Sequence, residues 1–288
     1  MAVVNTNISA SIAQAALARN ERALGTAMEQ LSTGRKINSA ADNASGLAIS
    51  TRMTSQIRGL DQAVRNANDA VSMVNTAEGA LDEITDMLQR IRELAVQSGT
   101  GTTSSSDRSY LHAELDHLIA EIDRVADNTQ WNGRNILNGA AGGSAGASTV
   151  AFQVGMDPTQ TISLSFGNMT DGASGVMSQL GASGILSTAT VASAIAQASS
   201  VLVWSDAAIE KISTQRATFG AVSNRLEHAV DNLTNVKTQS EASRSRILDT
   251  DYAASTSELA RTQIIQQAGT AMLAQANQLP ATVLTLLQ

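Results

Sequence analysis

The chain has 288 residues, a net charge of −7 and an isoelectric point near 5.0, an acidic balance that argues against nucleic-acid binding. Cysteine is absent, which excludes disulfides, thiolate metal sites and cysteine nucleophiles. Aromatic residues make up only 2% and there are two prolines, so the composition favours long, slim helices over a thick core.

The N-terminal segment is expected to be a helix with a narrow apolar stripe. Leu17, Leu24 and Leu31 recur every seven residues among small and polar side chains. A stripe of this width is typical of a seam against another helix. The start of the chain has no basic stretch followed by an apolar one, so no cleavable secretory signal is expected.

After turn residues at 32–39, apolar residues at spacings of three and four predict one helix over about 45–98, with a phase slip at Ala77. Such a helix would be about 80 Å long, at about 1.5 Å per residue. The segment 99–107 offers Ser and Asp caps for a next helix over 111–125.

The middle of the chain changes character. Asn-Gly turns at 132–133 and 138–139 precede a predicted β-hairpin region at about 150–166 and a Gly/Ser-rich loop at 167–187. Helical spacing returns over 195–236, and a break at 245–252 precedes a C-terminal helix. Its apolar stripe comprises Ile264, Ile265, Ala268, Met272, Leu273, Ala276 and Leu279, followed by Val283, Leu284, Leu286 and Leu287.

These elements predict a mainly α fold, in which long antiparallel helices form a rod or coiled-coil bundle with a small β-hairpin region at one end. The economical arrangement pairs the two ends of the chain antiparallel and puts the β region at the far tip.

No catalytic or metal site is expected. His112 and His117 are five residues apart, which is a poor spacing for a shared metal on one helix face. Asp249 and Asp251 are explained more simply by a turn and the positive end of a helix than by a cation. The serines lack a nucleophile-elbow pattern, and no cofactor motif is present.

Several runs of sequence resemble bacterial flagellin. They are NTN at 5–7, LSTG at 31–34, INSA at 37–40, RNANDA at 65–70, TAEGAL at 76–81, LQRIRELAVQ at 88–97, SRSRI at 243–247, DYA at 251–253, QQAGT at 266–270 and LAQANQ at 273–278. The likeness covers about 1–140 and 190–288, and the short middle segment is typical of a form without projecting outer domains.

This resemblance implies a structural subunit that polymerises into the flagellar filament for swimming motility. It implies residues 1–44 and 250–288 in an inner coiled-coil tube and residues 45–249 in a helical rod domain. It further implies export in an unfolded state to the cell exterior, and partners comprising further copies, an export chaperone, and the filament cap and hook–filament junction proteins. Leu17, Leu24, Leu31, Ile264, Met272, Leu279, Val283 and Leu286 would form the terminal assembly seam.

One further patch is expected on the helix over 81–98. At about 100° per residue, Arg90 and Gln97 lie away from the core stripe and Leu94 lies at its margin, with Glu114 near them on the next helix. This edge suits a contact between subunits. The resemblance also implies recognition of the same stretch by a vertebrate Toll-like receptor.

Three alternatives remain open. A hook–filament junction protein shares the terminal features, although the agreement over 88–97 and the last forty residues favours flagellin. An intracellular coiled-coil scaffold would differ in location, since sheared surface filaments would not contain it. An enzyme lacks any candidate site in the sequence.

Overall fold

The computed structural model describes residues 7–144, 148–170, 175–176 and 191–286, with side chains of the last range described over 195–278. The chain divides into two compact units. Unit 1 comprises Met1–Arg58 with Thr238–Gln288, and unit 2 comprises Gly59–Lys237. The helices are α1 (Ile8–Thr33), α2 (Ala40–Ser98), α3 (Ser105–Asn128), α4 (Val191–Leu248) and α5 (Tyr252–Leu286), and α2 and α4 each run from one unit into the other.

The predicted long helix is present as α2, which has 59 residues. Asn43 interrupts its first turn with φ −165° and ψ 97°, and its side-chain Oδ1 accepts a hydrogen bond from the Gly46 amide at 2.9 Å. The regular part of the helix therefore begins just after this cap, close to the expected start at residue 45.

The expected phase slip at Ala77 is wrong. The fully buried positions keep alternating spacings of four and three through that point: Ala63, Ala67, Ala70, Val74, Ala77, Leu81, Ile84, Leu88, Ile91 and Ala95. Val64 and Val71 suggested a different phase, but they are only half-buried. The seam uses alanines here, and small side chains let neighbouring helices approach closely.

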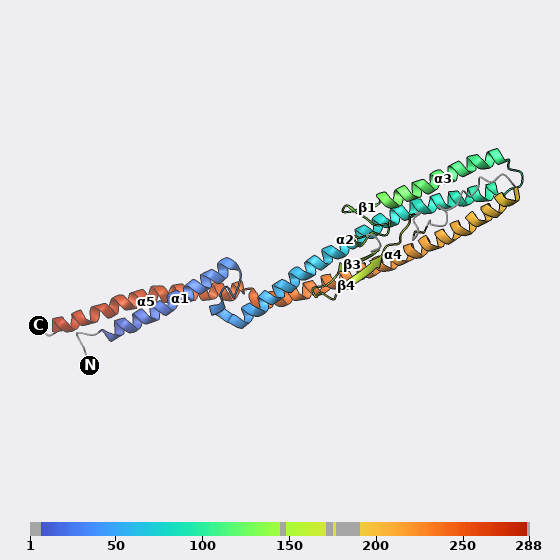
Figure 1. Ribbon diagram of the computed structural model, residues 1–288. Coiled ribbons are helices and arrows are strands. Elements are labelled where there is room, and N and C mark those ends of the chain that lie inside the picture. Colours follow the sequence, from blue (N-terminus) through green and yellow to red (C-terminus); the bar gives the residue numbers. More distant parts are fainter. Residues whose placement is uncertain (1–6, 145–147, 171–174, 177–190, 287–288) are drawn as a thin grey trace. The chain divides into compact units, whose positions relative to one another are not determined.

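In unit 2, α2, α3 and α4 lie side by side (Figure 1). Helices α2 and α4 run antiparallel, and three ion pairs mark their register. They join Asp61 to Lys237 at 2.6 Å, Asp82 to Arg216 at 2.9 Å and Arg92 to Asp206 at 2.7 Å. Helix α3 begins with a capping box between Ser104 and Asp107, which confirms the expected cap.

Two antiparallel strand pairs complete unit 2. Strands β1 (Gln130–Trp131) and β2 (Arg134–Asn135) join at Asn132 and Gly133, whose φ values of 49° and 74° explain the Asn-Gly sequence. The predicted hairpin is formed by β3 (Thr149–Gln153) and β4 (Thr161–Ser165). Alternate residues of β4, Ile162 and Leu164, are buried. Phe166, just after β4, contacts Phe219 of α4 with ring centroids 5.2 Å apart.

The placement of the β region at the far tip is wrong. The Asn66 side chain donates to the Gln153 carbonyl at 3.0 Å, and a Cβ at Gly59 would lie 3.3 Å from that of Met156. The hairpin therefore lies along the helices with its turn beside residue 59, because its apolar face packs onto α2 and α4. The opposite end of unit 2 contains the α2–α3 turn.

The expected Gly/Ser-rich loop falls largely outside the described residues. Within the described part, Met169 is buried and its amide donates to the Leu137 carbonyl at 2.7 Å. The residues after β4 thus return to the unit 2 core.

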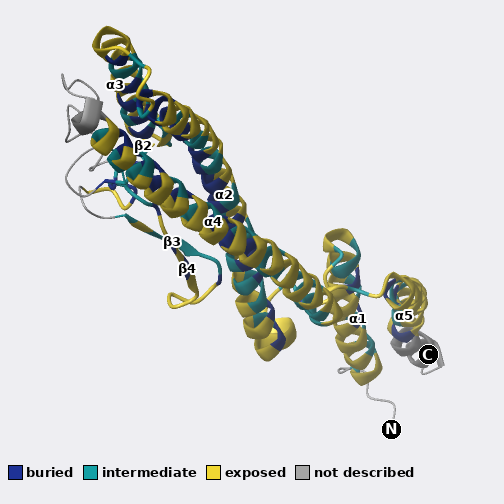
Figure 2. Ribbon diagram, turned by 90° about the vertical axis from the view of Figure 1, so that its right-hand side faces the viewer, coloured by how far each residue is buried: buried dark blue, intermediate teal, exposed yellow. Residues whose placement is uncertain are grey.

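In unit 1, α1 and α5 lie side by side (Figure 1). Figure 2 shows a contrast in burial between the units. The helices of unit 2 have dark-blue faces turned toward one another, whereas α1 and α5 are mainly yellow and teal. No helix in the described ranges combines the length and hydropathy needed to cross a membrane.

Candidate functional site: the terminal helix pair

The base of the pair is fixed by its two connections. Gly34 ends α1 with φ 68°, a conformation that favours glycine, and its carbonyl accepts a hydrogen bond from Thr250 at 3.1 Å. The Lys36 amide donates to the Leu248 carbonyl at 2.7 Å. Asp251 caps α5 by accepting from the Ala253 amide at 2.9 Å, which confirms its expected role at a helix start. The end of α1 is thereby held beside the start of α5.

The two helices contact each other along one heptad stripe each. On α1 the inward positions are Ala10, Ala13, Leu17, Asn20, Leu24, Ala27 and Leu31. On α5 they are Ser255, Leu259, Thr262, Gln266, Gly269, Leu273 and Ala276. We call these two stripes together the seam. Spacings of three and four are those of a coiled coil, but most seam side chains here are small or polar.

The seam runs antiparallel. Asn7, which caps α1, donates from its side chain to the Ala276 carbonyl at 2.8 Å. Asn20 donates to the Thr262 carbonyl at 2.8 Å, so a later residue of α1 meets an earlier residue of α5. The polar seam residues Asn20, Thr262 and Gln266 were not expected from the sequence, because hydrophobic periodicity reports only apolar side chains. For Asn20 a signal was available, since it lies three residues after Leu17 and four before Leu24, a spacing that puts it on the same helix stripe.

The expected terminal seam divides into two sets. Leu17, Leu24 and Leu31 are half-buried and lie on the α1 stripe that faces α5. The grouping of Ile264 and Met272 with Leu273 in one stripe is wrong, because both lie off the heptad phase and are 66% and 65% exposed. The side chains of Leu279, Val283 and Leu286 lie outside the described residues.

Large apolar side chains are exposed on the outward faces of this pair. They are Ile8, Ile12 and Met28 on α1, and Ile264, Ile265 and Met272 on α5. The inward faces bury few residues, and among those described the buried ones are Asn20, Ala27, Ser255, Thr262 and Ala276. The pair therefore leaves more bulky apolar surface outside than it encloses, which is typical of an interaction surface.

The patch expected on α2 is brought together in part. Arg90 lies 2.8 Å from Glu114 of α3 and 3.0 Å from Glu93, and its hydrogen bond to Glu114 raises the pKa of the Arg90 guanidinium. Gln97 is exposed and lines a shallow hollow with Gln89, Arg92, Glu93, Val96 and Thr100. The expected exposure of Leu94 is wrong, since it is fully buried. Helix α2 packs against both α3 and α4, so its buried face is wider than one stripe.

The histidine and aspartate residues weighed from the sequence make local contacts within the described part of the chain. His112 Nδ1 lies 3.3 Å from Asp116 Oδ1 on the same helix. The Asp249 carboxylate accepts a hydrogen bond from the Ser245 hydroxyl at 2.6 Å. Over the described residues, no three His, Asp or Glu side chains gather in a way that would hold a metal ion.

Comparison with known proteins gives the family. Residues 4–141 match the bacterial flagellin N-terminal helical region, and residues 202–287 match the bacterial flagellin C-terminal helical region. The flagellar filament 33 kDa core protein of Treponema phagedenis is 42% identical over 290 residues, covering 99% of this chain and 100% of that protein. A flagellin of Halalkalibacterium halodurans is 41% identical over 286 residues, with the same coverage.

Two further comparisons concern the length and the fold of the chain. The alignment with flagellin A of Vibrio cholerae runs over 375 positions at 36% identity, so that relative carries additional sequence. The structure of a putative flagellar hook-associated protein from Vibrio parahaemolyticus has a TM-score of 0.59, covering 72% of this chain and 100% of that one. At 15% identity this likeness shows the fold alone.

Long helices, and a terminal helix pair that exposes bulky apolar side chains, are features of structural proteins that associate with copies of themselves. The chain belongs to the bacterial flagellin family, in a short form, and is a structural subunit of the flagellar filament.

Proposed function

We propose that α1 and α5 become stably ordered only when the subunit joins the filament. Residues 1–44 and 250–288 then form the inner tube, and residues 45–249 form the outer rod domain. The observation that carries this proposal is the small, partly polar seam beside the outward apolar side chains of Ile8, Ile12, Ile264 and Met272. Ordering costs about 1–2 kcal/mol of backbone entropy per residue, so neighbouring subunits must supply much of the burial.

Hydrogen exchange on purified monomer and on filaments tests this proposal. In the monomer, we expect the amides of residues 7–33 and 255–286 to exchange freely and those of α2 in unit 2 to be protected. In the filament, both sets are protected. The α2 amides serve as the internal control for folding. Equal protection of the terminal helices in monomer and filament would contradict assembly-coupled ordering.

The C-terminal segment is proposed as the part needed for polymerisation and covered by an export chaperone. The last ten residues are rich in apolar side chains, namely Leu279, Val283, Leu284, Leu286 and Leu287. Such a segment must be kept from aggregating in a chain that awaits export. A chain truncated after Thr250 should remain a soluble helical monomer that neither polymerises nor binds the chaperone. Normal filaments from this truncation would refute the claim.

The location of the subunit and its export route are proposed from its role in the filament. We propose that the subunit acts outside the cell and is exported without a cleavable signal peptide. The filament cap and the hook–filament junction proteins are proposed as its further partners. Mass spectrometry of sheared filaments tests the route, because a chain exported intact retains the sequence that begins Ala2-Val3-Val4, with or without Met1. A filament subunit that begins well inside residues 7–33 indicates cleavage instead.

The surface around Arg90 is proposed as a contact between subunits and as the stretch that a vertebrate Toll-like receptor recognises on shed monomers. Arg90 and Gln97 are exposed and Glu114 is half-exposed, which supports an interaction there. Leu94 contributes to this surface indirectly, because its buried side chain packs α2 in the core of unit 2. Receptor signalling by the wild-type monomer, compared with Arg90→Asp, is the test, and a silent wild-type monomer would overturn it.

A further inference from the structure

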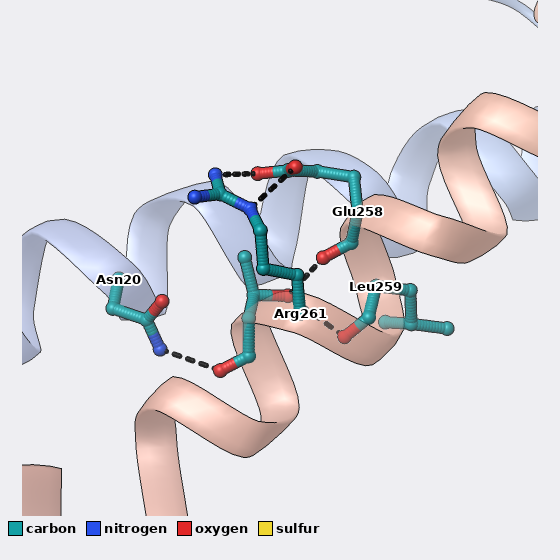
Figure 3. A network of polar contacts seen from close by, with 5 residues as sticks. Asn20, Glu258, Leu259 and Arg261 are labelled. Atoms are coloured by element: carbon teal, nitrogen blue, oxygen red, sulfur yellow. Dashed lines mark hydrogen bonds and ion pairs between the residues drawn. The ribbon is translucent and has the colours of Figure 1, made fainter. Parts of the chain in front are cut away.

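Asn20 is a buried polar residue in the middle of the α1 stripe, only 8% exposed. Figure 3 shows its side chain directed at α5, beside the network of Glu258, Leu259 and Arg261. The Asn20 Nδ2 donates to the Thr262 carbonyl at 2.8 Å and to Gln266 Oε1 at 3.1 Å. Both amide hydrogens of Asn20 are therefore used by α5.

The partners of Asn20 are themselves fixed. Thr262 is 1% exposed, and its hydroxyl donates back to the Glu258 carbonyl at 2.8 Å within α5. Gln266 Nε2 donates to Glu21 Oε1 at 3.2 Å, back on α1. Two neighbouring residues of α1 thus hold one side chain of α5, with Asn20 donating to Gln266 and Gln266 donating to Glu21. The Thr262 acceptor is a backbone carbonyl that any helix offers, whereas a helix without an acceptor side chain at position 266 would leave one of the two Asn20 amide hydrogens unpaired, which is costly.

A second, steric feature marks the same register. Gly269 sits in the interior of α5, where glycine is unfavourable by about 1 kcal/mol relative to alanine. A Cβ there would lie only 3.2 Å from Leu17 Cδ1, so the absent side chain makes room for Leu17. Leu17 precedes Asn20 by three residues and Gly269 follows Gln266 by three, as an antiparallel pair requires.

The outward faces of the helices make such markers necessary. Ile8, Ile12 and Met272 are bulkier than most seam residues, so apolar burial alone favours turning those faces inward. We infer that the Asn20–Gln266 hydrogen bond and the Leu17–Gly269 contact fix the register of α1 on α5 and which faces of the two helices meet. The bulky residues are thereby kept outward for neighbouring subunits. This inference rests on the proposed function and names the residues that direct it.

Engineered cysteines can read the facing directly, because the natural chain has none. Seven residues along α1 from Asn20 and seven back along α5 from Gln266 place Ala27 opposite Leu259. Full-length filaments carrying Ala27→Cys with Leu259→Cys should form a within-chain disulfide. The off-seam pair Met28→Cys with Leu259→Cys should form much less, since Met28 is 57% exposed on another face.

Asn20→Leu, alone and with Gln266→Leu, removes the polar marker and adds apolar area. The ratio of seam to off-seam disulfide should fall by about fivefold, the effect of one net hydrogen bond. Gln14→Leu, at an exposed position of α1, is the matched control and should leave the ratio unchanged. An unchanged ratio in both Asn20 variants overturns the polar half of the inference, and a lowered ratio supports it.

Should Asn20→Leu form no filaments, the steric pair decides. Gly269→Val places a side chain where Leu17 lies and should lower the ratio, and the added Leu17→Ala should restore it. Failure of Leu17→Ala to restore the ratio contradicts the selection by shape. Hydrogen-exchange protection of α1 and α5 in the monomer would overturn the proposed assembly-coupled ordering, but not the pairing inferred here. The disulfide ratio would then be measured in the monomer, so the ordering proposal and the pairing inference can fail separately.

Discussion

Arg90 Nη2 lies 2.8 Å from Glu114 Oε1, so a surface ion pair links α2 to α3, while Leu94, four residues after Arg90 on α2, is fully buried. The same short stretch of helix thus combines an exposed charged contact with a core side chain. Substitutions at neighbouring positions should therefore affect association and stability separately.

Exchanging the charges of the pair tests the exposed contact. Arg90→Asp alone should reduce filament assembly and receptor signalling while leaving monomer helicity intact, because exposed ion pairs add little to stability. Arg90→Glu with Glu114→Arg restores the pair with reversed polarity. If assembly depends only on linking α2 to α3, the double variant recovers it, and if a neighbouring subunit reads Arg90 itself, assembly stays low. Assembly by light scattering and helicity by circular dichroism separate these results.

Leu94→Ala should destabilise unit 2 by about 2–5 kcal/mol, the usual cost of emptying a core leucine site. Val96→Ala, two residues away at a position 55% exposed, is the matched control and should change the unfolding free energy little. Urea unfolding of the monomer measures both. Equal stability of the two variants would place Leu94 outside the core and restore the exposed edge expected from the sequence.

Much of the fold was predictable because heptad spacing directly reports buried helix faces. The long α2, the Ser104 cap, the β3–β4 hairpin and the breaks before α2 and α5 all follow from local pattern and turn chemistry. The error at Ala77 came from ranking valine above alanine. The buried stripe follows close helix approach, so Ala63 and Ala70 are inside while Val64 and Val71 are only partly so.

The candidate site was less predictable, since its specificity lies in polar and small residues. Leu17, Leu24 and Leu31 mark the α1 stripe, but the face of α5 is set by Thr262, Gln266 and Gly269, which carry no hydrophobic signal. Leu94 was expected at an exposed edge because a single apolar stripe predicts a single partner helix, whereas α2 packs against both α3 and α4. Which helices meet is a tertiary property that spacing along one segment does not contain.

Arg108 is a buried cation at the start of α3, 2% exposed. Its Nε donates to the Ser98 carbonyl at 3.3 Å and its Nη2 to the Thr100 carbonyl at 3.2 Å, at the C-terminal end of α2, where a cation is favourable. Arg108→Met should therefore cost about 2 kcal/mol of unfolding free energy, because these carbonyls lose a charged donor. Arg124→Met, at an exposed position of the same helix, is the control for losing an arginine, and equal urea midpoints for both variants would contradict the capping role.

The Ser104–Asp107 capping box should make the stability of α3 sensitive to acid. The Ser104 hydroxyl, and then the Ser104 amide, donate to the Asp107 carboxylate and hold its pKa below the ordinary value of 3.8. A lowered folded-state pKa gives stability that is fully present above the unfolded value and is lost as pH falls through the folded one.

Urea unfolding between neutral pH and about pH 2.5 should thus show wild type more stable than Asp107→Asn above about pH 4, with the gap closing below it. Ser104→Ala should lose about 1 kcal/mol at neutral pH and flatten the same acid limb, since it removes the donor that lowers the pKa. A gap between wild type and Asp107→Asn that stays constant down to the lowest pH would show that the carboxylate charge contributes nothing to this cap.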